Sequence, residues 1–362
     1  MSIKKSPLLI LALINPEKSL DFTLQQWDLF VRQARRSGVL ARFGYILESK
    51  ELLTKVPVDA LKHIQSAQTY ATQFETSLTW EVRCIQKAFE KLDLPLIFLK
   101  GTAYAVADNI VSEGRVFSDV DILVPEEKLA DVERALIYEG WKSAHLDAYD
   151  QRFYREWMHE IPPMQHVQRH TSIDVHHNVL PKTSRFCPNP EFLLANIIKV
   201  SDKNAWVLAP EDRVIHSATH LFHEGEFDHG FRDLSDLDLL LKEFDSLDDF
   251  WDKLLKRAEE LKQQLPLYYA LRYSSIILRT PIPENILNIS KQWLPNTFQR
   301  HLMDWLYCRA LMPNHSSCEL YWTAFAKWML YVRSHWIKMP VHLLVPHLCR
   351  KGWLQLTDQK DH

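Results

Sequence analysis

The sequence predicts an α+β protein, in which a small mixed β-sheet with helices over residues 93–180 is flanked by helical segments at 1–92 and 181–362. Apolar residues recur at helical spacing in both flanks, and short apolar runs alternate with helix signals in the centre. With 362 residues, 46% of them apolar, the chain is long enough for two or three domains with a full core. A formal net charge of -3 provides no general basic field, so a nonspecific binder of duplex nucleic acid is not expected.

The N-terminal flank carries three helix signals. Residues 8–14 are apolar but are followed by Asn-Pro-Glu without a small-residue cleavage site, so we expect a first helix there instead of a secretory signal. Thr23 is placed to cap an amphipathic helix that ends near Arg36. Residues 67–92 keep apolar side chains at helical spacing over their second half, which predicts a long helix.

The cysteine pattern and the hydropathy bear on location. Five cysteines are scattered without CxxC spacing, which suggests neither a disulfide framework nor a cysteine zinc site and suits a reducing, cytoplasmic environment. No window is apolar enough to predict a transmembrane segment. We therefore expect a cytoplasmic protein.

Two aspartates lie one residue apart in an apolar strand over residues 118–124. Side chains alternate along a strand, so Asp119 and Asp121 share one face, about 7 Å apart, while the apolar residues share the other. Two carboxylates so placed can ligate a pair of metal ions about 4 Å apart, and hard oxygen ligands suit Mg2+ or Mn2+. The alternative is that the two acids only solvate a strand edge.

An anion site is predicted just upstream. Residues 95–99 form a short apolar run that predicts a buried strand, and Lys100-Gly101-Thr102 follows directly before an alanine-rich helix over 103–107. We expect Thr102 to cap this helix and Gly101 to let the backbone approach a ligand closely. Free amides at the helix start and the charge of Lys100 favour a phosphate, although the spacing is not that of a Walker A loop.

A third carboxylate lies on a later strand. Residues 171–177 alternate, with Asp174 and His176 on one side and two apolar residues on the other. If this strand neighbours the strand of Asp119 and Asp121, the three acids converge on one site.

The remaining elements follow from caps and periodicity. Within the central region we expect a helix from Pro125 to Gly140 and strands over 141–145 and 152–157. After residue 181 the sequence predicts helices again, at 189–197, from Pro210 and over 232–244.

Histidines mark one helix in the C-terminal flank. On the helix from Pro210, His216, His220 and His223 fall on one face and could bind a transition metal. Without an HExxH motif, hydrogen-bonded packing histidines are the alternative.

The C-terminal tail over 305–354 mixes tryptophans with basic residues. This composition fits contact with a membrane surface, a partner protein or RNA, or a terminal helix packed on the preceding domain.

In order and type, these motifs resemble the bacterial uncharacterised nucleotidyltransferases of the DNA polymerase beta superfamily over most of residues 20–245. The resemblance is carried by Leu99-Lys100-Gly101, Arg115, residues 118–124 and 173–176, Pro210-Glu211-Asp212, and residues 232–237. In the superfamily the glycine turn is commonly Gly-Ser and lies closer to the aspartate pair, whereas here Thr102 replaces the serine and the gap is longer.

The resemblance implies a two-metal transfer of a nucleoside monophosphate, such as AMP, from a nucleoside triphosphate to an acceptor, with release of pyrophosphate. It implies that Asp119 and Asp121 hold Mg2+ or Mn2+ and that Asp174 bridges to one metal and helps deprotonate the acceptor. ATP is the expected donor, and the acceptor is left open among a protein, a small molecule, a sugar and an RNA. The supporting residues implied for the triphosphate and the cleft are Lys100, Gly101, Thr102, Arg115, Ser118, His176 and His220.

Two other classes of function stay open from the sequence. One is a non-catalytic nucleotide-binding or regulatory module on the same fold, which binds nucleotide without turnover. The other is a metal hydrolase built on His216, His220 and His223, which predicts stoichiometric transition metal in the purified protein.

Overall fold

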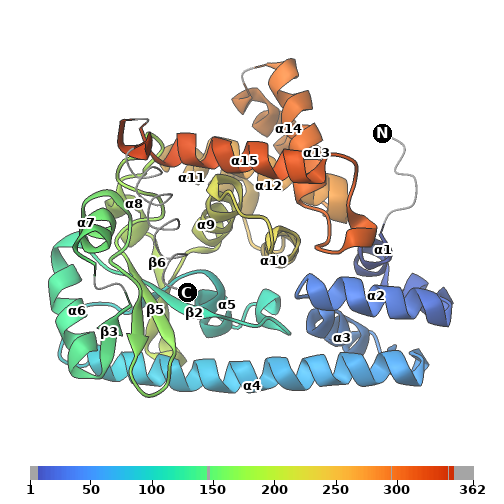
Figure 1. The fold of residues 1–362 in the computed structure, drawn as a ribbon, viewed down its shortest axis with the longest axis horizontal. Helices are drawn as coiled ribbons and strands as arrows, with labels where there is room; N and C mark the ends of the chain where they lie inside the picture. The colour runs from blue at the N-terminus through green and yellow to red at the C-terminus, as the bar shows by residue number, and fades with distance from the viewer. Residues whose placement is uncertain (1–6, 145–146, 295, 341, 346–362) are drawn as a thin grey trace, which may run out of the picture.

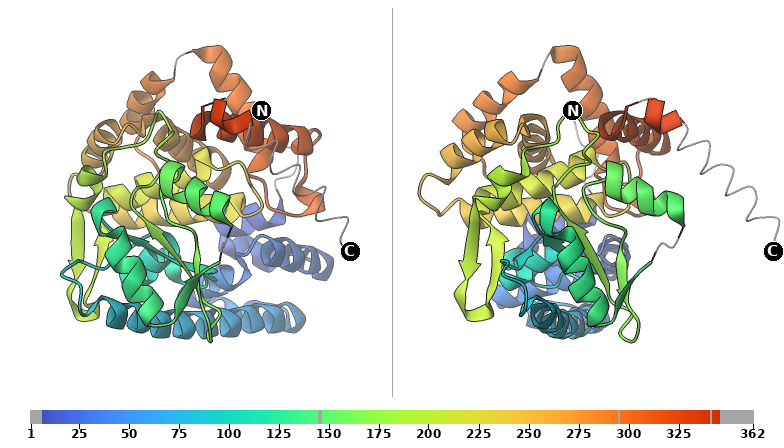
Figure 2. Two further views of the ribbon diagram at one scale, coloured as in Figure 1. Left: turned by 60° about the vertical axis from the view of Figure 1, so that its left-hand side comes forward. Right: turned by 90° about the vertical axis from the view of Figure 1, so that its left-hand side faces the viewer.

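The computed structural model describes residues 7–144, 147–294, 296–340 and 342–345 (Figure 1). A seven-stranded mixed sheet is surrounded by helices, so the predicted α+β class with a mixed sheet is confirmed. Figure 2 shows the C-terminal helices, in orange and red, above the sheet and the N-terminal helices, in blue, below and behind it.

The three helices predicted in the N-terminal flank form, and a fourth that was not predicted lies between the second and the third. The helices are α1 (Leu8–Ile14), α2 (Leu24–Arg36), the unpredicted α3 (Leu40–Ser49) and α4 (Val58–Phe89). Thr23 caps α2 in a reciprocal box, because its hydroxyl accepts from the Gln26 amide at 3.2 Å while the Gln26 side chain accepts from the Thr23 amide at 2.8 Å.

Helix α4 joins the two hydrophobic cores of the protein. It begins at Val58, earlier than the predicted residue 67, and runs beneath α2, α3 and the sheet (Figure 1). Its first half buries Ala60 and Ile64 in the core of the helical part, and its second half buries Val82 and Ile85 against the sheet. The sheet and the helical part are therefore braced by one 32-residue helix.

The sheet has the strand order β3-β4-β5-β2-β1-β7-β6. Its strands are β1 (Ile97–Phe98), β2 (Asp119–Leu123), β3 (Trp141–Ser143), β4 (Met164–His166), β5 (Ser172–His176), β6 (Ile197–Val200) and β7 (Ala205–Leu208). Strand β2 lies between antiparallel β1 and parallel β5, and its register places Asp121 directly opposite Asp174. The helices within this region are α5 (Lys100–Val106), α6 (Leu129–Tyr138), α7 (Ala148–Trp157) and α8 (Pro190–Leu194).

The strand predicted at 152–157 is wrong, because these residues form the second half of helix α7. The prediction overlooked the helical spacing of Tyr149, Phe153 and Trp157, which recur every four residues. Tyr149 and Phe153 lie with ring centroids 6.4 Å apart, and Phe153 and Trp157 with centroids 5.7 Å apart. This i,i+4 spacing belongs to one helix face.

The expectation of helices alone after residue 181 is also wrong. Helix α8 ends at Leu194, before the predicted residue 197, and β6 and β7 then form an antiparallel hairpin. Asn204 takes the left-handed conformation at φ +44° in the turn, which a short polar side chain tolerates. The sheet therefore extends to residue 208, because β7 pairs with β1 beyond the predicted boundary at 180.

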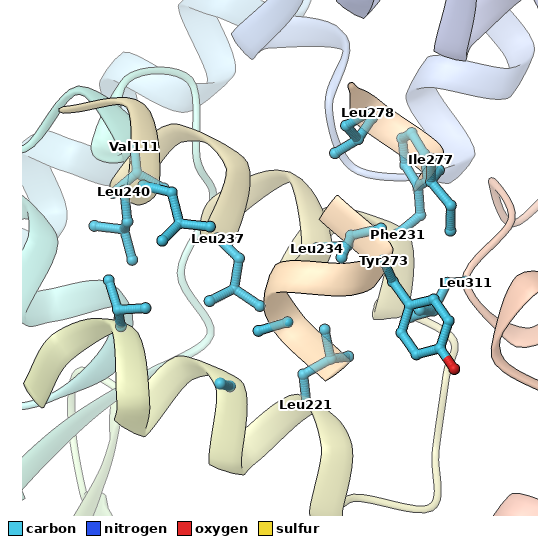
Figure 3. Packing of buried hydrophobic residues seen from close by; sticks show 14 of the residues in the cluster. Val111, Leu221, Phe231, Leu234, Leu237, Leu240, Tyr273, Ile277, Leu278 and Leu311 are labelled. Carbon is cyan, nitrogen blue, oxygen red and sulfur yellow. The ribbon is translucent and has the colours of Figure 1, made fainter. Parts of the chain in front are cut away.

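The C-terminal flank packs into a helical layer. Its helices are α9 (Pro210–His223), α10 (Gly230–Phe244), α11 (Phe250–Glu260), α12 (Gln264–Tyr273), α13 (Glu284–Ser290), α14 (Thr297–Ala310) and α15 (Thr323–Lys338). Leu221 of α9, Leu234 and Leu237 of α10 and Tyr273 of α12 lie in one buried cluster (Figure 3). This cluster fixes α9 against α10, the two helices that face the strand with the aspartate pair.

The predicted aromatic tail is partly helix α15. This helix buries Ala326 and Leu330 but leaves Trp328 and Trp336 exposed. Arg350, Lys351 and Trp353, which belong to the same prediction, lie outside the described residues. Within the part of the chain that the structure describes, no helix is both long and apolar enough to cross a membrane.

Candidate active site

The three predicted acids lie on neighbouring strands. Strands β2 and β5 are parallel neighbours, with Asp119 opposite Ser172 and Asp121 opposite Asp174. Ligand atoms of Asp121, Asp174 and His176 all lie within 4.8 Å of one another. The condition set by the sequence, that the strand of Asp174 neighbours the strand of the aspartate pair, is met.

Asp121 is a buried charge with two partners. Only 2% of the residue is exposed, and its Oδ1 accepts from Lys100 Nζ at 2.7 Å and from His176 Nε2 at 2.8 Å. Burial alone raises the pKa of this carboxyl, but the Lys100 ammonium and His176 outweigh burial and hold the pKa well below its ordinary range. Asp121 therefore stays ionised.

Lys100 reaches Asp121 from a constrained backbone. Its φ is +45°, a left-handed conformation that costs a non-glycine residue about 1–3 kcal/mol and is often found at functional sites. Helix α5 begins at this residue, and the Leu99 carbonyl accepts from the Ala103 amide at 3.1 Å. The expectation that Thr102 caps the helix is wrong, because Thr102 already lies inside its first turn.

Asp174 has the opposite titration behaviour. Burial, the charge of Asp121 and the charge of Glu160 together raise the pKa of Asp174 to about 7. A carboxyl with this pKa can exchange a proton near neutral pH, which suits a general base.

The raised pKa of Asp174 predicts a pH-dependent stability in metal-free protein. The pKa of Asp174 is higher in the folded protein, at about 7, than the 3.8 of an unfolded chain. The protonated carboxyl therefore stabilises the fold fully below pH 3.8, and this stabilisation is lost as the pH rises through 7. With chelator present at pH 8, we expect the free energy of unfolding of Asp174→Asn to be about 1–3 kcal/mol higher than that of the wild type. The value is less than the full pKa shift would give, because Asp174 is partly exposed and solvent screens its charge. At pH 4, close to the unfolded pKa, most of this difference should be gone.

Denaturant unfolding between pH 4 and pH 8 measures this difference. Asp202→Asn, in the exposed turn of the β6–β7 hairpin, is the matched control and should show no such trend. A difference between wild type and Asp174→Asn that is constant across this range would contradict the proposed environment of Asp174.

A cavity of about 180 Å³ lies beside β2, between α5, α9 and α10. Predicted site residues that line it are Lys100, Gly101, Arg115, Ser118, Asp119, Asp121 and His220. Ser118 Oγ donates to Asp119 Oδ1 at 2.9 Å and so orients that carboxylate. Cations and carboxylates thus face one enclosed space, as a phosphate and metal site requires.

Gly101 is needed for the approach of a side chain. A Cβ at this position would lie 2.1 Å from Arg115 Nη1 and 2.5 Å from Phe117 Cδ1. We predicted that Gly101 lets a ligand approach the backbone closely. In the structure the side chain of Arg115 occupies this space, and its guanidinium packs against the start of α5.

Arg115 is held by a buried acid, Asp236, to which the sequence assigned no role in the site. Its Nε donates to Asp236 Oδ2 at 2.8 Å, and Arg42 Nη2 donates to Asp236 Oδ1 at 2.6 Å. Arg42 and Asp236 are 3% and 2% exposed. The sequence signal for this network is the place of Asp236 in residues 232–237, which carry the family resemblance, whereas no motif marked Arg42.

A second, larger cavity of about 660 Å³ adjoins the first. Lys100, His220 and Arg232 line both, whereas Asp174 and Glu160 line only the larger one. Asp121 and Asp174 therefore face two adjoining spaces from paired strands.

Three of the predicted site residues do not line the smaller cavity, and two of these line neither cavity. Thr102 is buried inside α5, with no hydrogen-bond partner for its hydroxyl, and lines neither cavity. His176 lies behind Asp121 and is 1% exposed, instead of lining the cleft. Asp174 lines the larger cavity only.

The histidine face of α9 does not bring its three imidazoles together. His216 and His223 are buried, and burial lowers the pKa of each imidazole. Among the residues that the structure describes, the groups of three ligand atoms within 4.8 Å do not include His216, His220 and His223 together. Two of these histidines are therefore packed in the interior, although the Nδ1 of His223 is without the hydrogen bond that the packing alternative expected.

Comparison with known proteins gives one match. A family model described as uncharacterised nucleotidyltransferase matches residues 23–279, which include every predicted site residue. No curated protein and no solved structure matches the chain.

Proposed function

The chain belongs to the uncharacterised nucleotidyltransferase family, and from this premise we propose that it moves a nucleoside monophosphate from a nucleoside triphosphate to an acceptor hydroxyl. ATP is the first candidate donor, and pyrophosphate is the released product. The observation that best supports the proposal is the register of Asp121 against Asp174 beside Lys100.

The acids fit a divalent metal. Asp119, Asp121 and Asp174 offer the hard oxygen ligands that Mg2+ or Mn2+ prefers. Burial and the neighbouring carboxylates raise the pKa of Asp174, so a cation placed there would relieve this repulsion. When bound there, such a metal would neutralise phosphate charge and stabilise the attacking and leaving oxygens.

The residues of the chain divide between donor and acceptor. Lys100 and Arg115 face the smaller cavity, where their charges would hold the triphosphate against Gly101 and Ser118. Asp174 faces the larger cavity, where the acceptor would lie. The acceptor oxygen forms a bond to the α-phosphorus, the bond to the bridging oxygen breaks, pyrophosphate leaves, and Asp174 takes the hydroxyl proton.

Thermal unfolding with Mg2+ and each nucleoside triphosphate tests whether the site binds its donor. Binding only to the folded state raises the free energy of unfolding by about 2.7 kcal/mol at a hundredfold excess over the dissociation constant. We expect a Mg2+-dependent rise in Tm for at least one nucleotide, and we expect Asp119→Asn to remove it.

Asp228→Asn is the matched control, since this exposed acid lines only the larger cavity and should leave the shift intact. If no nucleotide raises Tm in the wild type, or if Asp119→Asn keeps the full shift, the donor site is elsewhere and the proposal is wrong.

A further inference from the structure

His159, Glu160 and His176 form a cluster beside the proposed active site. One ligand atom from each lies within 4.8 Å of the others. The pair His159-Glu160 follows α7, and its backbone pairs with the end of β5. Glu160 forms an isolated antiparallel β-bridge with His176, and the His177 amide donates to the His159 carbonyl at 2.8 Å. His159 and Glu160 also line the larger cavity, which provides an entry path from solvent.

The two nitrogens of His176 have different surroundings. Nε2 lies 2.8 Å from Asp121 Oδ1, so it carries a proton and donates to that carboxylate. Nδ1 is buried, makes no hydrogen bond, and lies 3.3 Å from Glu160 Oε2. This Nδ1 and the Glu160 carboxylate therefore face each other at a distance at which one cation, a proton or a metal ion, is shared between them.

His159 supplies a second buried imidazole. Its Nδ1 is buried without a hydrogen-bond partner, and its ring centroid lies 5.2 Å from that of His176. One ring nitrogen of each histidine and one Glu160 oxygen lie within 4.8 Å of one another. Buried polar atoms are nearly always hydrogen-bonded in folded proteins, so the buried Nδ1 of His159 is available to a ligand that enters from the larger cavity.

We propose that His159, Glu160 and His176 bind a divalent transition metal ion of the zinc type, at a site separate from the Mg2+ site of the proposed function. Imidazole nitrogens favour such ions over Mg2+, and two histidines with one carboxylate leave a coordination position open, here towards the larger cavity.

Two features of the cluster fit metal ligation. Ligating histidines usually donate their other N–H to a carboxylate, and Asp121 is that carboxylate for His176. Bonds of about 2.0–2.2 Å to a tetrahedral ion place ligand atoms about 3.5 Å apart, so the side chains need to close by about 1 Å. His159 and Glu160 lie between α7 and β4, outside any helix, so rotation of their side chains can bring the ligand atoms closer while their backbone stays paired with the end of β5.

Equilibrium dialysis against Zn2+, followed by elemental analysis, tests the site in the full chain. The parent protein is Asp119→Asn with Asp174→Asn, which removes acids of the Mg2+ site but keeps Asp121 on His176. We expect one zinc per chain in this parent. Adding Glu160→Gln or His159→Ala should weaken zinc binding by at least about tenfold, whereas adding His229→Ala, a histidine of the same cavity outside the cluster, should not.

The opposite results overturn the proposal. If the parent binds no zinc, His176 and Glu160 form only an ion pair of an imidazolium with a carboxylate. If zinc binds equally well with Glu160→Gln, the ion lies elsewhere. Glu160→Gln is nearly isosteric, so it decides the matter even if His159→Ala fails to fold, and circular dichroism verifies the fold of each variant.

Discussion

Asp236→Ala lowers the free energy of unfolding by about 3–5 kcal/mol, the usual cost of removing one partner from a buried ion pair. Arg42 and Arg115 both donate to this carboxylate, and Arg42 is almost completely buried. Burial alone raises the pKa of Asp236, but the charges of Arg115 and Arg42 keep it lowered, so the acid stays ionised. Without Asp236, two guanidinium groups are left in a low-dielectric interior without their main counter-charge.

Denaturant unfolding at neutral pH measures this effect. Asp233→Ala is the matched control on the same helix, because Asp233 lies 4.0 Å from Arg115 Nη2, is more exposed and pairs mainly with Arg232. We expect the control to cost about 1 kcal/mol or less. A loss below about 1 kcal/mol for Asp236→Ala would show that the two arginines are not held by this acid.

We expect Asp121→Asn to reduce the proposed nucleotidyl transfer by at least roughly a thousandfold, since a metal ligand that stabilises transition-state charge is worth several kcal/mol. Asparagine is the appropriate replacement because it keeps the shape and one oxygen acceptor for Lys100 and His176. Alanine would instead leave both partners unpaired in the interior, and the loss of activity would then be mixed with unfolding.

Loss of catalysis and loss of the fold are distinguished by measuring turnover with a saturating donor and the Tm of each protein. Asp108→Asn, an exposed acid paired with Lys203 away from both cavities, should retain full activity. If Asp121→Asn keeps more than about a tenth of wild-type turnover while folded, Asp121 is not part of the reacting centre.

Local patterns predicted the strands of the site well. The alternation in 118–124 and 171–177 gave β2, β5 and the faces of their acids, because a strand with one buried face must place its polar residues together. Thr23 was an equally local signal, since it caps α2 as expected. The polar residue Thr102 failed as a cap because the left-handed φ of Lys100 starts the helix two residues earlier.

Long-range contacts were beyond the sequence. Arg42 and Asp236 are separated by 194 positions in the sequence. No local pattern around either residue predicts that the two form an ion pair. Glu160 and His159 follow a helix that was predicted in part as a strand, so their place beside His176 depended on an element that was assigned wrongly. The four-residue strands β6 and β7 are too short for a period of 2 to be distinguished from a buried helix turn.

We propose that the protein transfers the α-phosphate of a nucleotide together with its nucleoside. The most direct test is a labelling assay. The protein is incubated with Mg2+ and with an extract that supplies small and large molecules as acceptors. The donor is ATP or another nucleotide, labelled with 32P at either the α or the γ position. We predict that α-label moves to an acceptor, that γ-label is released as pyrophosphate, and that Asp121→Asn abolishes both. Label transferred from the γ position, or nucleotide that is bound but never turned over, would contradict the account.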